Sequence, residues 1–155
     1  MNKDNDEFLP KLLGYLGLLP FITTTFLLYM DSDHSETWSH LLISYAAVIL
    51  SFVGAIHWAF AMTINKVNQF ERRIAFIWSV IPSLVAWVSL FINEFFALII
   101  ISLFFILNLI KDKKSLKTVD LPNWYLPMRS HLTYVVTTCL TISAFHSEIS
   151  MLRLP

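Results

Sequence analysis

Apolar stretches alternate with short polar segments along the whole chain. Five of them are long, at residues 9–30, 41–64, 74–92, 95–110 and 129–146. An α-helix rises about 1.5 Å per residue, so roughly 20 apolar residues cross the ~30 Å hydrocarbon core of a bilayer. The pattern predicts an all-α fold: residues 1–155 form a single domain, a polytopic integral membrane bundle of five transmembrane helices. Residues 44–64 contain no Asp, Glu, Lys or Arg, and we expect this second span at the centre.

Small residues recur every three or four positions along two of the predicted spans. Residues at this spacing share one face of a helix, and small side chains there let a neighbouring backbone approach closely. We therefore expect tight helix packing along both faces. The second span carries Ala47, Ser51, Gly54 and Ala61, and the third carries Ser79, Pro82, Ser83 and Ala86.

Two further features bear on the shape and placement of the spans. Pro20 lies in the middle of the first span and removes a backbone donor, which leaves the carbonyl of Leu16 without its helical partner. We expect a kink there, with Thr23 and Thr24 close enough to bond freed backbone groups. The span 95–110 is apolar on every side, and we expect it to face lipid.

The composition places the protein in a membrane. Hydrophobic residues make up 56% of the chain and charged residues 14%, against roughly 25% charged residues in ordinary globular proteins. A soluble monomer of this composition would expose large apolar patches. The N-terminal segment is acidic and lacks arginine, unlike a mitochondrial transit peptide, and no cleavable signal peptide is recognisable. We expect an uncleaved protein of a bacterial inner membrane, in preference to the mitochondrial inner membrane.

The charged residues predict an orientation. With the N-terminus inside and five spans, ten of the eleven basic residues lie on the inner side, which satisfies the positive-inside rule. The outer loops then carry acidic residues, and the chain runs N-in, C-out. The ten inner basic residues are Lys3, Lys11, Lys66, Arg72, Arg73, Lys111, Lys113, Lys114, Lys117 and Arg129; Arg153 is outside.

The sequence offers little that predicts catalysis. All Asp, Glu, Lys and Arg residues are expected outside the spans or at their rims, which disfavours ion-coupled transport, because such transporters bury ionisable groups. Hydrolase, zinc-protease and nucleotide-binding motifs are missing from the sequence. Cys139 is the single cysteine, so neither an internal disulfide nor a cysteine metal motif is expected. We predict no catalytic residue, no metal site and no nucleic-acid binding.

His57 is the one titratable residue well inside a predicted span. It either bonds a neighbouring helix and holds the bundle in register, or it contacts a ligand. A third interpretation is haem ligation. His57 and His131 would ligate one haem on the inner side, and His40 and His146 a second haem on the outer side. His40 and His57 are 17 residues apart, which places them roughly 100° apart around one helix, so they cannot both face stacked haems. We therefore expect no cofactor.

Four sequence blocks resemble a known family. They are LGYLGLLPF at residues 13–21, SYAAVILSFVGAIHW at 44–58, WSVIPSLVAW at 78–87 and LPNWYLPMRSHLT at 121–133. In this order they are similar to the domain of unknown function 3429 family. The resemblance implies a small multi-span membrane protein without an assigned biochemical activity. Positions that match the family blocks supply our candidate ligand-binding residues, namely Ser51, His57, Trp58, Pro82, Trp87, Trp124, Tyr125 and Arg129.

The leading functional hypothesis is a non-enzymatic bundle that binds a small apolar ligand, a lipid or a partner membrane protein. We expect its pocket between the second, third and fifth spans, around His57, Trp58, Pro82 and Arg129. The basic inner rim would also hold anionic lipid head groups. The alternative is a small-molecule transporter or translocator, or a membrane enzyme, with His57 as the polar residue of its site.

Overall fold

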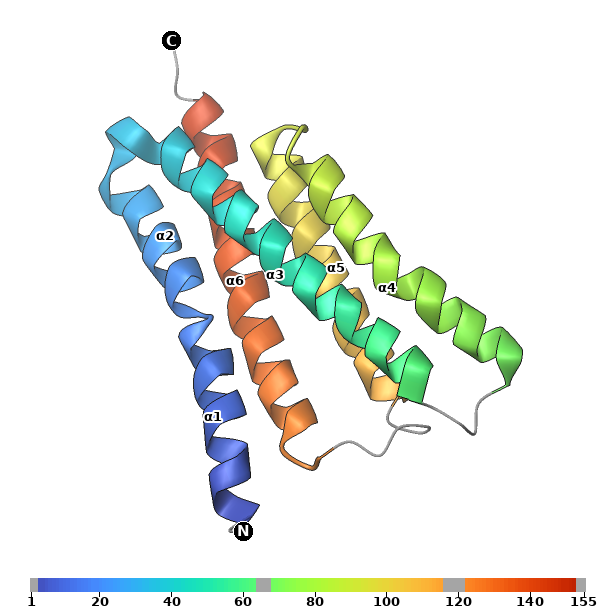
Figure 1. The fold of residues 1–155 in the computed structure, drawn as a ribbon. Helices are drawn as coiled ribbons and strands as arrows, with labels where there is room; N and C mark the ends of the chain where they lie inside the picture. The colour runs from blue at the N-terminus through green and yellow to red at the C-terminus, as the bar shows by residue number, and fades with distance from the viewer. Residues whose placement is uncertain (1–2, 64–67, 116–121, 153–155) are drawn as a thin grey trace.

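The computed structural model describes residues 3–63, 68–115 and 122–152, and its secondary structure there is entirely helical (Figure 1). The predicted all-α class is therefore confirmed. Lys66, Lys117 and Arg153, which enter the charge count, lie outside the described residues, as does the predicted end of the second span at residue 64. The helices are α1 (Lys3–Leu16), α2 (Leu19–Met30), the 3₁₀ turn η1 (Ser32–His34), α3 (Ser35–Thr63), α4 (Gln69–Ser89), α5 (Glu94–Ser115) and α6 (Tyr125–Leu152).

The bundle is arranged around α3. This helix contacts α2, α4, α5 and α6, so the expected central position of the second span is confirmed. Helices α1 and α2 run end to end as one bent rod beside α6, and the two chain ends lie at opposite ends of the bundle (Figure 1). The end of the bundle where α3 and α5 finish and α4 and α6 begin is called the basic end below. Three stretches of the described chain are long and apolar enough to cross a membrane, Glu7–Met30, Ser32–Met62 and Glu94–Lys114.

The first span is interrupted earlier than expected. Helix α1 ends at Leu16 and α2 begins at Leu19, so the chain breaks at Gly17 and Leu18. Pro20 falls in the first turn of α2, where its missing N–H leaves no hydrogen bond unmade. The carbonyl of Gly17 accepts a hydrogen bond from the Tyr45 hydroxyl of α3 at 3.0 Å. This bond satisfies a backbone acceptor at the break and ties it to the central helix.

Helix α5 is exposed on one face only, so the expectation that span 95–110 faces lipid holds for that face, where Phe96, Leu103 and Ile106 are 41–59% exposed. Ala97, Leu98, Ile101 and Phe105 are all buried, and α5 packs against α3, α4 and α6. A helix that is apolar on every side can satisfy either environment. Here one face meets the neighbouring helices and the other forms part of the apolar outer surface.

The expected tight packing of the small-residue faces is confirmed where α3 meets α4. A Cβ atom added to Gly54 would lie 2.8 Å from Cβ of Pro82 and 2.9 Å from its Cγ. Real Cβ atoms do not approach carbon that closely, so only glycine fits at this position of α3. Ser79 and Ala86, one turn on either side of Pro82, are buried on the same face of α4.

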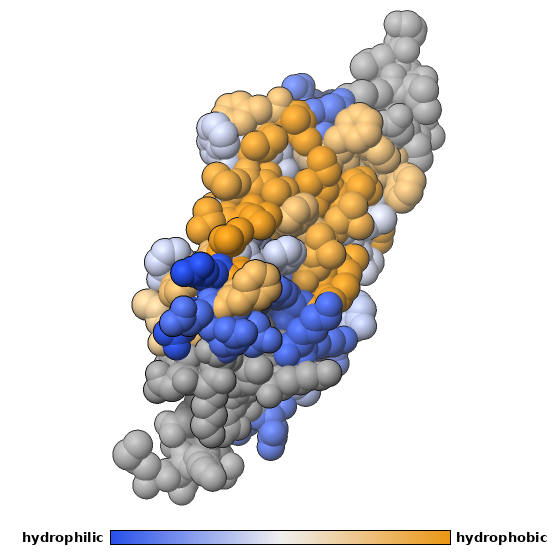
Figure 2. Space-filling view, turned by 90° about the vertical axis from the view of Figure 1, so that its right-hand side faces the viewer, coloured by the Kyte–Doolittle hydropathy of each residue, from blue (hydrophilic) through white to orange (hydrophobic). Residues whose placement is uncertain are grey.

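The outer surface is apolar between two polar ends. Figure 2 shows a broad hydrophobic band on one side of the molecule, with hydrophilic residues above and below it. Large apolar side chains such as Phe52, Trp87 and Phe91 are 60–72% exposed. Such a surface would be strongly unfavourable in water but matches the hydrocarbon interior of a bilayer.

Candidate functional site

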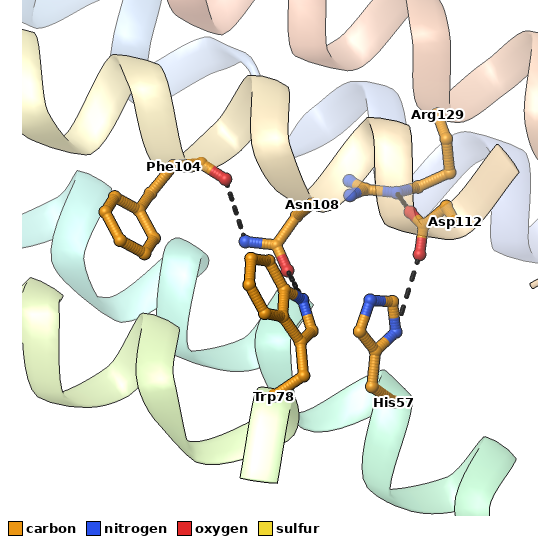
Figure 3. A network of polar contacts seen from close by, with 6 residues as sticks. All are labelled: His57, Trp78, Phe104, Asn108, Asp112 and Arg129. Atoms are coloured by element: carbon orange, nitrogen blue, oxygen red, sulfur yellow. Dashed lines mark hydrogen bonds and ion pairs between the residues drawn. The ribbon is translucent and has the colours of Figure 1, made fainter. Parts of the chain in front are cut away.

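Polar side chains from four helices meet inside the basic end of the bundle. Helix α3 contributes His57, α4 contributes Trp78, α5 contributes Asn108 and Asp112, and α6 contributes Arg129 (Figure 3). We call these five residues the polar cluster. Asn108 and Asp112 are four residues apart on α5, so both point from one face of that helix.

The centre of the polar cluster is a buried ion pair. Nε of Arg129 donates to Oδ2 of Asp112 at 3.0 Å, and the two residues are 6% and 0% exposed. Buried charges are stable only when they are paired, because removal from water costs each of them several kcal/mol. The pair links the last turns of α5 to the first turns of α6.

His57 approaches the same carboxylate from the opposite side. Its Nδ1 lies 3.6 Å from Oδ1 of Asp112, which is beyond hydrogen-bond distance. His57 is 2% exposed, and both of its ring nitrogens lack a hydrogen-bond partner among the described residues. Buried polar atoms are usually hydrogen-bonded, so the two ring nitrogens of His57 are an exception in this cluster.

A second chain of hydrogen bonds extends the polar cluster towards the middle of the bundle. Nε1 of Trp78 donates to Oδ1 of Asn108 at 3.3 Å, and Nδ2 of Asn108 donates to the carbonyl of Phe104 at 2.8 Å. The ammonium of Lys111 lies 5.2 Å from the centre of the Trp78 ring, within reach of a cation–π interaction. Trp78 therefore ties α4 to α5 through both its N–H and its ring.

The buried ion pair corrects one prediction from the sequence. Asp112 and Arg129 were expected outside the spans or at their rims, and Asp112 belongs to the lysine-rich segment that begins at Lys111. Helix α5 instead continues to Ser115 and α6 begins at Tyr125, so both residues lie inside helices longer than the spans 95–110 and 129–146. The spacing of Asn108 and Asp112 was the available signal, since two polar residues one turn apart on an apolar helix mark an inward face.

An apolar groove runs along the bundle between the α1–α2 rod, α3 and α6. It has a volume of about 490 Å³, within the range of small-molecule sites. No substantial contact between α1 and α3 is found in the described chain, so the groove opens where these helices diverge. Leu13 and Phe52 on its rim are 60% and 69% exposed, which means that it opens sideways onto the apolar surface. Tyr125, Arg129 and Thr133 are its polar lining.

The structure brings together some of the predicted site residues and separates others. Trp124, Tyr125 and Arg129 line the groove, and His57 lies behind it next to Asp112. The groove is therefore bounded by the first, second and fifth predicted spans, and not by the third as expected. The remaining candidates lie elsewhere: Ser51 bonds the carbonyl of Ala47, Pro82 packs on Gly54, Trp58 contacts Phe76 and Trp87 contacts Phe91 at the exposed surface.

One group of potential metal ligands lies at the opposite end of the bundle. Ligand atoms of Glu36, His40 and Glu94 come within 4.8 Å of one another. Glu36 and His40 share the first turns of α3, and Glu94 begins α5. Glu36 and His40 are exposed, and this group has no contact with the polar cluster or the groove.

An apolar helical bundle with a buried ion pair and a groove open at its apolar surface defines the class of this molecule, a helical membrane protein. Residues 7–145 match the family model described as "Protein of unknown function (DUF3429)". The chain belongs to this family, as the four sequence blocks indicated.

A curated relative supports the membrane assignment. The chain is similar to Transmembrane protein 69 of Xenopus tropicalis, with 30% identity over 141 residues. The match covers 88% of this chain and 54% of the relative, so the chain spans about half the length of that protein. No solved structure matches the chain.

Proposed function

We propose that this protein is a non-enzymatic, five-span membrane protein whose groove binds one long apolar chain from the surrounding bilayer. The observation that carries the proposal is the groove itself. Its volume of about 490 Å³ and its largely apolar lining suit a single acyl or isoprenoid chain. Its opening at the exposed rim residues Leu13 and Phe52 lets such a chain enter sideways without passing through water.

The proposed topology is N-in, C-out with the basic end at the cytoplasmic face of a bacterial inner membrane. It is supported by the position of the chain ends at opposite ends of the bundle (Figure 1). Charge supports it as well, because Arg72 and Lys113 lie near the basic end and Asp33 and Glu94 near the other. The positive-inside rule places the basic end in the cytoplasm.

The groove is tested with a matched pair of tryptophan variants on α3. Ile49 lines the groove, whereas its neighbour Val48 is 65% exposed and lies outside it. Ile49→Trp fills the groove, and Val48→Trp adds the same side chain to the lipid-facing surface. Native mass spectrometry of the purified proteins titrated with methyl hexadecanoate should show one bound molecule on the wild type and on Val48→Trp, and none on Ile49→Trp. Equal binding by both variants would contradict the proposal.

The topology is tested by labelling single cysteines. In a Cys139→Ser background, Asp33→Cys and Lys113→Cys lie at opposite ends of the bundle. A membrane-impermeant maleimide added to intact spheroplasts should label Asp33→Cys and leave Lys113→Cys unlabelled until the membrane is opened. The reverse pattern, or labelling of both sites from one side, would overturn the five-span orientation.

A second candidate function is transport of a small molecule. The polar cluster favours it, because ionisable residues inside a membrane bundle commonly mark transport paths. His57→Ala separates the two functions. If His57→Ala loses the flux of a small molecule into proteoliposomes that the wild type shows, and still binds methyl hexadecanoate, the result favours transport. If His57→Ala keeps both the stability and the flux of the wild type, the result favours the binding function.

A further inference from the structure

We infer that the groove, at the basic end of the bundle, recognises the carbonyl oxygen of an uncharged head group. The bound molecule is then a neutral lipid such as a long-chain ester or quinone. The inference rests on the proposed binding of an apolar chain and adds the chemistry of its head. Three observations carry it, namely a row of donors on α6, their lack of hydrogen bonds of good geometry, and the balance of charge around them.

The donors form one row on α6. Tyr125, Arg129 and Thr133 follow each other at intervals of four residues, so their side chains share one face of the helix. All three line the groove at its basic end. Tyrosine and threonine hydroxyls can donate one hydrogen bond each, and a guanidinium has five donor hydrogens and no acceptor.

Each of these side chains has a buried polar atom that makes no hydrogen bond of good geometry in the described part of the chain, although the Arg129 guanidinium lies close enough to the Tyr125 hydroxyl to interact with it. The atoms are Oη of Tyr125, Nη2 of Arg129 and Oγ1 of Thr133. Arg129 and Thr133 are 6% and 2% exposed, so their polar atoms are shielded from bulk water. A buried donor without a partner costs about 1–3 kcal/mol, and a carbonyl oxygen, with its two lone pairs, would satisfy up to two of these donors.

The charged residue in the groove lining favours a neutral head group. Arg129 is already paired with Asp112 through Nε, so the pair carries no net charge. Lys11, whose ammonium lies 5.9 Å from the centre of the Trp124 ring at the same end, is paired with Glu7 at 2.9 Å. An anionic head group would bring an uncompensated charge into a site of low polarity. A carbonyl oxygen accepts hydrogen bonds without that cost.

The experiment compares probes of equal chain length on the full chain in detergent. Methyl hexadecanoate carries a neutral carbonyl, hexadecane carries only the chain, and hexadecanoate carries an anionic head; a decyl-substituted benzoquinone tests the quinone head. We expect the ester and the quinone to bind more tightly than hexadecane and hexadecanoate. Apparent Kd values come from native mass spectrometry.

Two near-isosteric variants remove one donor each without removing charge. Tyr125→Phe and Thr133→Val should each raise the Kd for methyl hexadecanoate about 3- to 10-fold, the loss expected for one neutral hydrogen bond. The Kd for hexadecane should not change. Thr141→Val is the matched control, because Thr141 lies two turns further along α6, bonds the carbonyl of Thr137 and does not line the groove.

The possible failures are distinguishable. If hexadecane and methyl hexadecanoate bind equally, or if Thr141→Val has the effect of Thr133→Val, the head-group site is wrong and the groove still binds a chain. If hexadecanoate binds most tightly, the site is one for anionic head groups and the neutral assignment falls. If no probe binds to folded wild-type protein, the chain-binding function and the head-group site fall together.

Discussion

Asp112 and Arg129 form an ion pair of 3.0 Å at the point where α5 ends and α6 begins, fully enclosed by the bundle. The residues are 17 positions apart in the chain, and the segment between them includes most of the lysine-rich region. The pair therefore fixes how the last two helices meet. It also determines which atoms of the guanidinium remain available to the groove, since Nε is used and Nη2 is not.

Breaking this pair should destabilise the protein strongly. Asp112→Asn leaves the Arg129 charge buried without a counterion, and we expect a loss of about 3–5 kcal/mol in the free energy of unfolding. Arg129→Gln should cost a similar amount. The double variant should be more stable than the sum of the two single effects predicts, by more than about 1 kcal/mol, because it removes both charges. Unfolding titrations in mixed micelles measure the free energy of unfolding of the two single variants and the double variant. If the loss in the double variant equals the sum of the two single losses, the pair does not act as a unit.

The contact between Gly54 and Pro82 predicts an unusually harmful alanine. Alanine normally favours a helix over glycine by about 1 kcal/mol, but at position 54 its Cβ would meet the rigid Pro82 ring at 2.8 Å. We expect Gly54→Ala to lower the free energy of unfolding by about 1–3 kcal/mol, as overpacked positions do.

The control for this prediction is Gly14→Ala. Its added Cβ would meet Sδ of Met128 at 3.2 Å, and the end of a methionine side chain can move aside. We expect no loss of stability there. Pro82→Gly combined with Gly54→Ala moves the small residue to the other helix and should restore part of the stability. A Gly54→Ala protein as stable as Gly14→Ala would refute the close contact.

Hydropathy was sufficient to predict the helical stretches, and small-residue spacing predicted two closely packed faces, which the structure brings together where α3 meets α4. Both depend on patterns within one segment, since a helix that crosses lipid must be apolar along its length and closely packed helices need small residues. Which face of α5 is buried could not be predicted in this way. An apolar side chain such as Ile101 is equally stable against lipid and against another helix, so composition does not separate the two environments.

The candidate site depends on relations between segments that no single stretch of sequence contains. His57 and Arg129 could be nominated from the sequence, but their shared partner Asp112 was hidden among lysines. The groove lies between α1, α3 and α6, and the break at Gly17 and Leu18 forms part of its lining. Local propensity indicated a disturbance near Pro20, whereas the break lies at Gly17 and Leu18, where Tyr45 of another segment donates to the Gly17 carbonyl.

The turn between α2 and α3 predicts a dependence on pH. Hydrogen bonds from His34 at 3.0 Å and from Trp38 at 3.2 Å hold the pKa of the Asp31 carboxyl below its ordinary value of 3.8. A carboxyl with a lowered folded-state pKa stabilises the turn above the ordinary value, and the contribution is lost as the pH falls through the lowered pKa. Trp38 fluorescence should therefore titrate below pH 3.8, and Asp31→Asn should abolish this step. A step that persists in Asp31→Asn would assign it to another group.

Tyr45 should determine the bend that forms one wall of the groove. Its hydroxyl donates to the Gly17 carbonyl, and Tyr45→Phe leaves that acceptor without its donor while the ring keeps its edge contact with Phe21. We expect a loss of about 1–3 kcal/mol in the free energy of unfolding and faster hydrogen exchange of the amides at positions 18–22. Tyr134→Phe is the matched control, because Tyr134 is 61% exposed.

Tyr45→Phe should also weaken ligand binding, because α1 would be less firmly oriented without the Tyr45 hydrogen bond. We expect it to weaken the binding of hexadecane and of methyl hexadecanoate to the same extent. Thr133→Val, in contrast, should weaken the binding of the ester alone. Unchanged exchange at positions 18–22 would show that the break holds its geometry without Tyr45.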